Sequence, residues 1–236
     1  MTIPALTTKR GLRLLYLPNE HTLGDEHLQH GSRQTFERLH ASGELSAYEV
    51  FSFLWEYRRS GDGQATLDKL LLIADEFQPD IIFWQHVGGF PVTPESLATL
   101  KALPSAPKLV YHEADPYGRY IKTFDRAIKT LISDADLVVM SGTGQFVDLA
   151  AAAGAKRVLY CPQPFDATRF GAPWTPSTRR PFDLVMIGNY GASPLPGRAF
   201  PGARKRRRLA QGACKRFGDR FALYGKGWRG LPCARG

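Results

Sequence analysis

The sequence has few cysteines and no long apolar run. Its 236 residues include three cysteines, Cys161, Cys214 and Cys233. Their odd number and wide spacing favour neither a disulfide framework nor a zinc site, so we expect reduced thiols. No stretch approaches the ~20 consecutive apolar residues of a membrane-spanning helix. The first residues lead into an apolar run that is too short, and too polar at its flanks, for a signal peptide. We therefore expect a cytoplasmic protein.

Motifs that would identify several enzyme classes are also missing. There is no GxSxG motif and no GxxxxGK[ST] loop, which argues against an α/β-hydrolase and a P-loop NTPase. The six histidines show no HExxH or other metal-ligand spacing, so no metal site is expected. Gly188, Gly191 and Gly197 have the wrong spacing for a GxGxxG fingerprint.

Acidic residues are almost missing from the last part of the chain. Residues 201–236 contain 11 basic residues and one acidic residue, whereas the first 200 contain 20 and 21. The net charge of +9 is therefore local and centred on residues 204–208. Three interpretations stay open: a solvated helix face, pairing of Arg204 or a neighbour with ligand phosphates, or contact with nucleic acid or an anionic membrane. Nucleic acid is the less expected partner, because no aromatic stacking positions accompany the basic run.

Short apolar runs alternate with helix-length segments through most of the chain. Strands are expected at residues 12–17, 48–55, 80–87, 108–112, 135–140 and 157–161, with helices at 25–41, 67–77, 94–102, 124–132 and 146–153. Thr93 is the expected N-cap of the third of these helices, with Pro94 in its first position. The alternation predicts a doubly wound parallel sheet with helices on both faces, an α/β domain of the Rossmann-like class.

The pattern changes after the sixth predicted strand. Prolines become frequent, and residues 165–181 are interpreted as an interdomain linker that follows a first domain at 1–164. A strand at 182–187, a basic helix at 203–217 and a strand at 220–224 predict the start of a second Rossmann-like domain, residues 182–236. One strand–helix–strand unit cannot bury both faces of its sheet, so we expect this domain to be incomplete and the chain truncated.

Three motifs occur in a defined order in the second half of the chain. Pro162, Asp166 and Phe170 form a P-x3-D-x3-F pattern, residues 182–188 read FDLVMIG, and residues 224–228 read YGKGW. In this order the segment from residue 107 onward resembles the glycosyltransferases related to the spore-coat maturation protein CgeB, within the group-1 glycosyltransferases. The resemblance covers a little over half of the chain.

The resemblance implies two facing Rossmann-like domains of the GT-B type with a cleft between them. The first domain would hold an acceptor, and the second a nucleotide-sugar donor, with no further cofactor. The implied activity is transfer of a sugar to an acceptor hydroxyl. The later half of the second domain normally grips the nucleotide, so the chain as given is expected to be incomplete or inactive. The alternative is a non-catalytic binding domain that retains this fold.

Candidate site residues follow the predicted strands, because doubly wound sheets bind ligands at the carboxyl ends of their strands. Their plainer alternatives are ordinary β–α turns and a turn capped by the Asp115 side chain. We expect these roles: Asp115 and His112 as catalytic residues; His86, Gly88, Gly89 and Glu113 as acceptor contacts; and Gly188, Asn189 and Arg204 as donor contacts.

Overall fold

The computed structural model describes residues 11–24, 28–120, 122–162, 180–191, 202–228 and 230–235. The chain divides into two compact units. Unit 1 comprises Met1–Asp115 and Phe124–Ala172, and unit 2 comprises Pro116–Thr123 and Pro173–Gly236. The predicted linker at 165–181 lies almost entirely outside the described residues.

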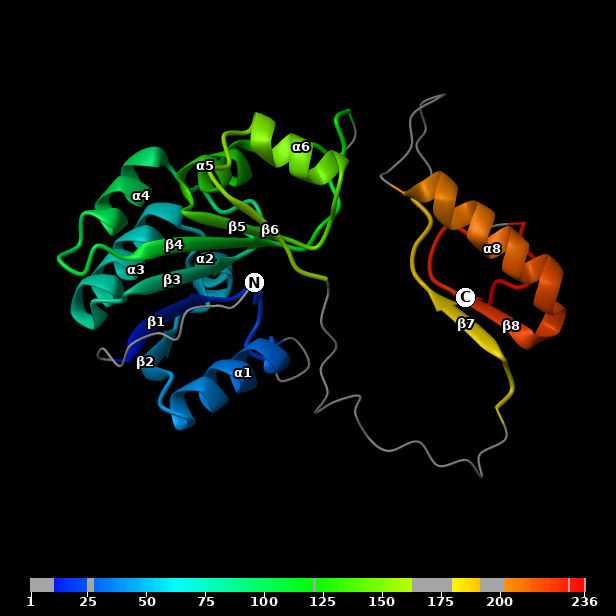
Figure 1. Ribbon diagram of the computed structural model, residues 1–236, viewed down its shortest axis with the longest axis horizontal. Helices are drawn as coiled ribbons and strands as arrows, with labels where there is room; N and C mark the ends of the chain where they lie inside the picture. The colour runs from blue at the N-terminus through cyan, green and yellow to red at the C-terminus, as the bar shows by residue number, and fades with distance from the viewer. Residues whose placement is uncertain are drawn as a thin grey trace, which may run out of the picture. The chain divides into compact units, whose positions relative to one another are not determined.

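Unit 1 contains a six-stranded parallel sheet in the order β2-β1-β3-β4-β5-β6 (Figure 1). The chain moves toward one edge from β1 to β2 and toward the opposite edge in every later connection. The gap between β1 and β3 is therefore the topological switch point, where sheets of this class bind ligands. The strands are β1 (Leu12–Leu17), β2 (Leu45–Val50), β3 (Ile81–Gln85), β4 (Lys108–Glu113), β5 (Leu137–Met140) and β6 (Val158–Tyr160).

Six described helices connect these strands: α1 (His30–Ala41), α2 (Phe53–Ser60), α3 (Gly63–Phe77), α4 (Pro94–Lys101), α5 (Arg126–Asp134) and α6 (Gln145–Ala152). Parallel crossovers are right-handed, so the reversal at the switch point puts α1 on one face and α3 to α5 on the other (Figure 1). The doubly wound α/β fold predicted from the sequence is confirmed.

Most of the buried strand residues of unit 1 lie on the sheet face under α3 to α5, whereas Tyr16 of β1 is buried on the opposite face against Phe36 of α1. Alternate residues of each strand point to the face under α3 to α5, as the strand pleat requires. Trp84 of β3 and Tyr111 of β4 are fully buried there. Phe53 and Phe90 pack their rings against Trp84, with centroid distances of 5.3 and 6.4 Å.

One predicted element is wrong over half of its length. Residues 48–55 were expected to form a strand, but β2 ends at Val50 and α2 begins at Phe53. Phe53 and Tyr57 both contact Phe90, at 5.2 and 5.3 Å. Residues four apart lie about 6 Å from each other along a helix but about 13 Å along a strand, so only a helix brings both rings to Phe90. The aromatic composition favoured a strand, whereas the burial follows the helical period.

The other predicted elements of unit 1 are confirmed to within a few residues where they are described; residues 25–27 of the first predicted helix lie outside the description. The cap of α4 is also as expected. The Ser96 N–H donates to Thr93 Oγ1 at 3.2 Å, and the Thr93 N–H donates to Ser96 Oγ at 3.2 Å. No described helix is long and apolar enough to cross a bilayer.

Unit 2 contains a two-stranded parallel sheet, β7 (Leu184–Ile187) and β8 (Phe221–Tyr224), joined through α8 (Ala203–Phe217). A short 3-10 turn, η2 (Gly218–Arg220), links α8 to β8. These elements match the strand–helix–strand prediction. The small core consists of residues from α8, β8 and the segment that follows: Ala210, Phe221, Leu223, Trp228 and Cys233.

Cys214 and Cys233 form a disulfide, with their Cα atoms 5.8 Å apart, so the prediction of reduced thiols is wrong for this pair. The chain after Trp228 turns back along β8, where the Leu223 N–H donates to the Cys233 carbonyl at 3.0 Å. This return brings Cys233 against α8. Sequence spacing does not reveal such a return. Cys161 is an exposed free thiol.

Candidate functional site

The carboxyl ends of β1, β3 and β4 lie next to one another at the switch point. β1 leads into Asn19 and Glu20, β3 into His86, and β4 ends at Glu113. Parallel strands present their carboxyl ends at the same edge, so side chains far apart in sequence meet here. We call the group formed by His86, Tyr111, Glu113 and Asp115 the His86 site.

Glu113 is the residue that the other three members of the His86 site contact. Its side chain is completely buried, with 0% exposed. Oε2 accepts hydrogen bonds from the Tyr111 hydroxyl at 2.6 Å and from His86 Nδ1 at 2.9 Å. Oε1 accepts from the Asp115 backbone N–H at 3.0 Å. Both oxygens are therefore occupied by donors, as a buried carboxylate requires.

The contact with Glu113 determines which ring nitrogen of His86 carries the proton. A carboxylate oxygen accepts, so Nδ1 is the protonated nitrogen, and Nε2 is the one able to take a proton. The His86 side chain is 21% exposed, which leaves the ring partly open to solvent. A histidine that is oriented by a buried carboxylate is the arrangement of a general base.

The backbone at His86 adopts an unusual conformation. Its φ is +34°, in the left-handed region that non-glycine residues rarely occupy. The His86 N–H donates to the His112 carbonyl at 2.9 Å and helps to hold this conformation. Gly88 follows with a φ of +54°, and a Cβ at that position would lie 3.1 Å from Leu54 Cδ1. Strained backbone concentrates at functional sites.

Asp115 joins the His86 site through its side chain as well. His86, Glu113 and Asp115 each offer a metal-ligand atom, and these atoms lie within 4.8 Å of one another. The group could hold a cation, although the sequence predicted no metal. A metal on Glu113 would have to replace hydrogen bonds that already occupy both of its oxygens. The arrangement therefore suits proton transfer better than metal binding.

His112 lies apart from this group, although it was predicted together with Asp115. It points to the face of β4 opposite Tyr111 and Glu113, because successive residues of a strand alternate. Its ring stacks on Phe83 with a centroid distance of 6.0 Å. Burial lowers the pKa of His112 below its usual value and favours the neutral ring. Among the predicted residues, the structure thus brings Asp115, His86 and Glu113 together and leaves His112 outside.

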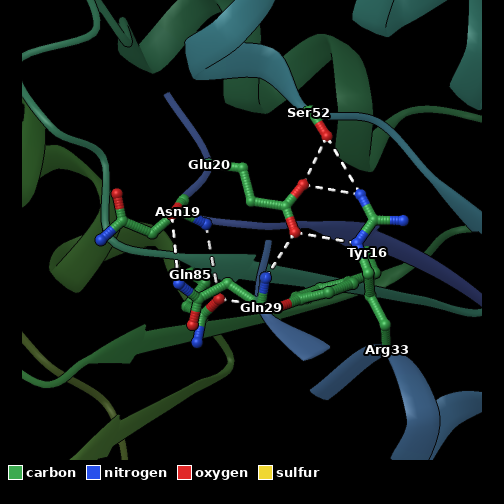
Figure 2. Close-up of polar contacts among 7 residues, drawn as sticks. All are labelled: Tyr16, Asn19, Glu20, Gln29, Arg33, Ser52 and Gln85. Atoms are coloured by element: carbon green, nitrogen blue, oxygen red, sulfur yellow. Dashed lines mark hydrogen bonds and ion pairs between the residues drawn. The ribbon is translucent and has the colours of Figure 1, made fainter. Parts of the chain in front are cut away.

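A second polar network supports the same edge of the sheet (Figure 2). Glu20 is fully buried, and its carboxylate is bidentate with Arg33: Nε donates to Oε1 at 2.8 Å and Nη2 to Oε2 at 2.6 Å. The Ser52 hydroxyl donates to Oε2 at 2.7 Å, and the Gln29 N–H donates to Oε1 at 2.9 Å. Glu20 thereby ties the end of β1 to the start of α1 and to the β2–α2 connection.

The opposite effects of burial and hydrogen bonding decide the charge of Glu20. Burial alone raises the pKa of this carboxyl. The hydrogen bonds from Arg33, from the Gln29 N–H and from Ser52 outweigh burial and hold the pKa below its usual value. Glu20 is therefore ionised at neutral pH and works as a structural anion.

Gln85, the residue before His86, is held by hydrogen bonds from the end of β1. The Tyr16 hydroxyl donates to Gln85 Oε1 at 2.6 Å, and the Asn19 N–H donates to the same oxygen at 3.4 Å (Figure 2). These bonds join the ends of β1 and β3 on either side of the switch point. Glu20, Arg33 and Gln85 were not predicted from the sequence as members of this region. The position of Glu20 just after a predicted strand was the available signal.

Of the residues predicted for a donor, Gly188 and Asn189 lie at the carboxyl end of β7, and Arg204 lies in the first turn of α8. Asn189 Oδ1 accepts from the Lys226 N–H at 2.8 Å, and the Asn189 carbonyl accepts from Arg206 Nη1 at 2.8 Å. Trp228 Nε1 donates to the Gly188 carbonyl at 2.6 Å. The loop after β7 is thus bound to the loop after β8, and Arg206 of α8 contacts Asn189.

The glycines of this region have different roles. A Cβ on Gly225 would lie 2.4 Å from the Gly188 carbonyl oxygen, and one on Gly227 would lie 2.3 Å from the Tyr190 oxygen. These two glycines of the YGKGW motif let the two loops pack at backbone distance. A Cβ on Gly188 would meet no described atom within 4 Å, so the space beside Gly188 is open within the described chain.

The sequence matches no protein-family model, and a comparison with curated proteins finds no match either. The class of protein is defined by the structure alone. It is an α/β protein with a Rossmann-like parallel sheet in the order 2-1-3-4-5-6 and a second, two-stranded parallel sheet.

Proposed function

We propose that this chain belongs to an enzyme that transfers a sugar from a nucleotide-sugar donor to an acceptor hydroxyl, with His86 as the general base. The observation that carries this proposal is the 2.9 Å contact between His86 Nδ1 and the buried carboxylate of Glu113 at the switch point. The motif resemblance supplies the substrate class. The geometry supplies a group suited to deprotonating a hydroxyl.

In this mechanism the acceptor hydroxyl lies against Nε2 of His86. Its oxygen forms a bond to the anomeric carbon while the bond from that carbon to the diphosphate breaks. The hydroxyl proton moves to Nε2, and the diphosphate leaves with the electron pair of the broken bond. Glu113 stabilises the imidazolium that forms, because its carboxylate already accepts a hydrogen bond from the Nδ1–H group of His86. Tyr111 and the Asp115 N–H hold that carboxylate in place.

Asp115 has a supporting role in this proposal. Its carboxylate lies within 4.8 Å of the ligand atoms of His86 and Glu113. The exposed position of Asp115 allows it to accept a hydrogen bond from a second acceptor hydroxyl. On the donor side, Gly188 and Asn189 are the residues proposed to face the nucleotide.

The test begins with donor binding, measured by calorimetry with a panel of nucleoside diphosphates and their sugars. Saturable binding of one nucleotide is expected, followed by release of its diphosphate in the presence of an acceptor. His86→Gln should lower that release by about 10²–10⁴-fold while leaving donor affinity unchanged. His112→Gln is the matched control on the opposite face of β4 and should retain activity. Absence of nucleotide binding to the chain contradicts the proposal and favours the non-catalytic alternative.

A further inference from the structure

The exposed face of α8 carries an unusual density of positive charge. Seven of its fifteen residues are Lys or Arg. Arg204, Arg208 and Lys215 project within a narrow arc of the helix, because residues 4 and 11 positions apart return to almost the same side. They span about 16 Å along the axis. Three more exposed cations flank this line: Lys205, Arg207 and Arg216.

The described acidic residues of this part of unit 2 do not neutralise the face. They are Asp183 and Asp219, and they pair with Arg220 and Arg235, outside α8. Among the described residues of unit 2, no carboxylate lies within ion-pair distance of Lys205, Arg208, Lys215 or Arg216. The opposite face of α8 is occupied by packing, since Ala203 and Ala210 are buried in unit 2. The cationic face is thus the surface that α8 presents outward.

We propose that this face binds an anionic membrane surface. Clusters of four to eight basic residues along one helix face are typical of contacts with anionic lipid headgroups. Leu209 lies among the cations and is 61% exposed, which provides an apolar contact for the headgroup boundary. No exposed aromatic residue of α8 is available for a nucleic-acid base to stack on, because Phe217 and the Tyr190 ring beside Arg207 are both half-buried. One bound diphosphate would engage only part of the face. The inference does not depend on the proposed enzymatic function.

The test is cosedimentation of the full chain with vesicles at physiological salt. The chain should pellet with vesicles of equal parts phosphatidylcholine and phosphatidylserine, and stay in solution with phosphatidylcholine alone. The double variant Arg208→Glu, Lys215→Glu should lose at least about 30-fold in partitioning. The control, Arg126→Glu with Lys129→Glu on the exposed side of α5, changes the net charge equally and should bind like the original chain.

Two further variants make the result specific. Arg208→Ala with Lys215→Ala tests the same positions without introducing repulsion and should weaken binding by a smaller factor. Leu209→Ser leaves the charge unchanged and should lower partitioning several-fold. Circular dichroism verifies that each variant is folded. The proposal would be overturned if the α5 control lost as much vesicle binding as the α8 double variant, or if the chain bound neutral vesicles equally well. It would also be overturned if the chain bound a labelled oligonucleotide more tightly than vesicles and Leu209→Ser left that binding unchanged.

Discussion

β3 of unit 1 and β7 of unit 2 are similarly apolar strands, but they are buried very differently. In β3 of unit 1, Ile82 and Trp84 are 1% and 0% exposed, whereas in β7 of unit 2 Ile187 is 82% exposed. Parallel strands are normally covered on both faces. The difference shows that an apolar run predicts a strand but does not say whether its neighbours cover it. In unit 1 the covering helices supply the stability, so unit 2 must depend more on other contacts.

Those other contacts are concentrated around Trp228. Its ring packs on Tyr190 with a centroid distance of 5.2 Å, and its Nε1 donates to the Gly188 carbonyl. The Cys214–Cys233 disulfide joins α8 to the segment after β8. Together these contacts connect the parts of unit 2, whose sheet has only two described strands. The two units therefore differ in what stabilises them: packing of helices on the sheet in unit 1, and cross-links between segments in unit 2.

The sharpest test of this contrast uses the same substitution in both sheets. Ile82→Ala removes a fully buried side chain and should lower the free energy of unfolding by about 2–5 kcal/mol, from lost burial and the cavity that remains. Ile187→Ala should change it by less than about 0.5 kcal/mol, because that side chain is already in solvent. Denaturant unfolding followed by circular dichroism measures both values.

Equal destabilisation by the two isoleucine variants would break the comparison. It would mean that β7 is covered in solution by a surface that the described residues do not supply. Hydrogen exchange of the β7 peptide would then be slow in the original chain and fast in Ile187→Ala. Fast exchange in both would agree with an uncovered strand.

Cross-linking in unit 2 gives the second prediction. Cys214 and Cys233 are 19 residues apart, and a loop of that length is worth about 3 kcal/mol when closed by a disulfide. Reduction, or Cys233→Ser, should therefore accelerate hydrogen exchange in α8 and β8 and leave β3 and β4 unchanged. Disulfides persist in oxidising surroundings and are reduced in the cytosol, so the measurement is made with and without reductant. Cys161→Ser, at the exposed free thiol, should have no effect. Loss of protection in β3 would show that the units are not independent.

The sequence was sufficient to predict most of the fold. Apolar runs and helical periodicity located fourteen of the strands and helices, because each element buries one side at a regular period. The period was misjudged at α2, where aromatic residues suggested a strand. The disulfide was missed for a different reason. Its two cysteines meet only because the chain turns back after β8, and no local pattern encodes that return.

The candidate site was predictable only in part. His86, Glu113 and Asp115 were found because they follow strands, and strand ends meet at one edge of the sheet. Their separate roles depend on which side of the strand each residue faces. His112 and Glu113 are neighbours in sequence, yet they point in opposite directions. The partnership of Glu20 with Arg33 was not predictable, since it depends on how α1 docks on the sheet.

The third prediction concerns pH and should again separate the two units. His112 and Glu20, whose pKa values the fold lowers, both lie in unit 1. A lowered pKa means that the unfolded chain binds protons more readily, so each group stabilises the fold above its unfolded pKa and this contribution is lost as the pH falls. Stability should decline first below about pH 6.5, through His112 and through His21, whose pKa burial also lowers. It should decline again below about pH 4.3, through Glu20 and through Glu56, whose pKa its hydrogen bond with Arg59 lowers.

Each unit by which the pKa is lowered corresponds to about 1.4 kcal/mol of stability. The measurement is the denaturant midpoint between about pH 2 and about pH 8, combined with hydrogen exchange of α8 and β8. His112→Phe keeps the stacking on Phe83 and should flatten the decline near pH 6.5 without altering the lower one. If the whole decline near pH 6.5 persists in this variant, His112 does not contribute to it. If hydrogen exchange in α8 accelerates at the same pH as in β4, the two units do not differ in their stability at low pH.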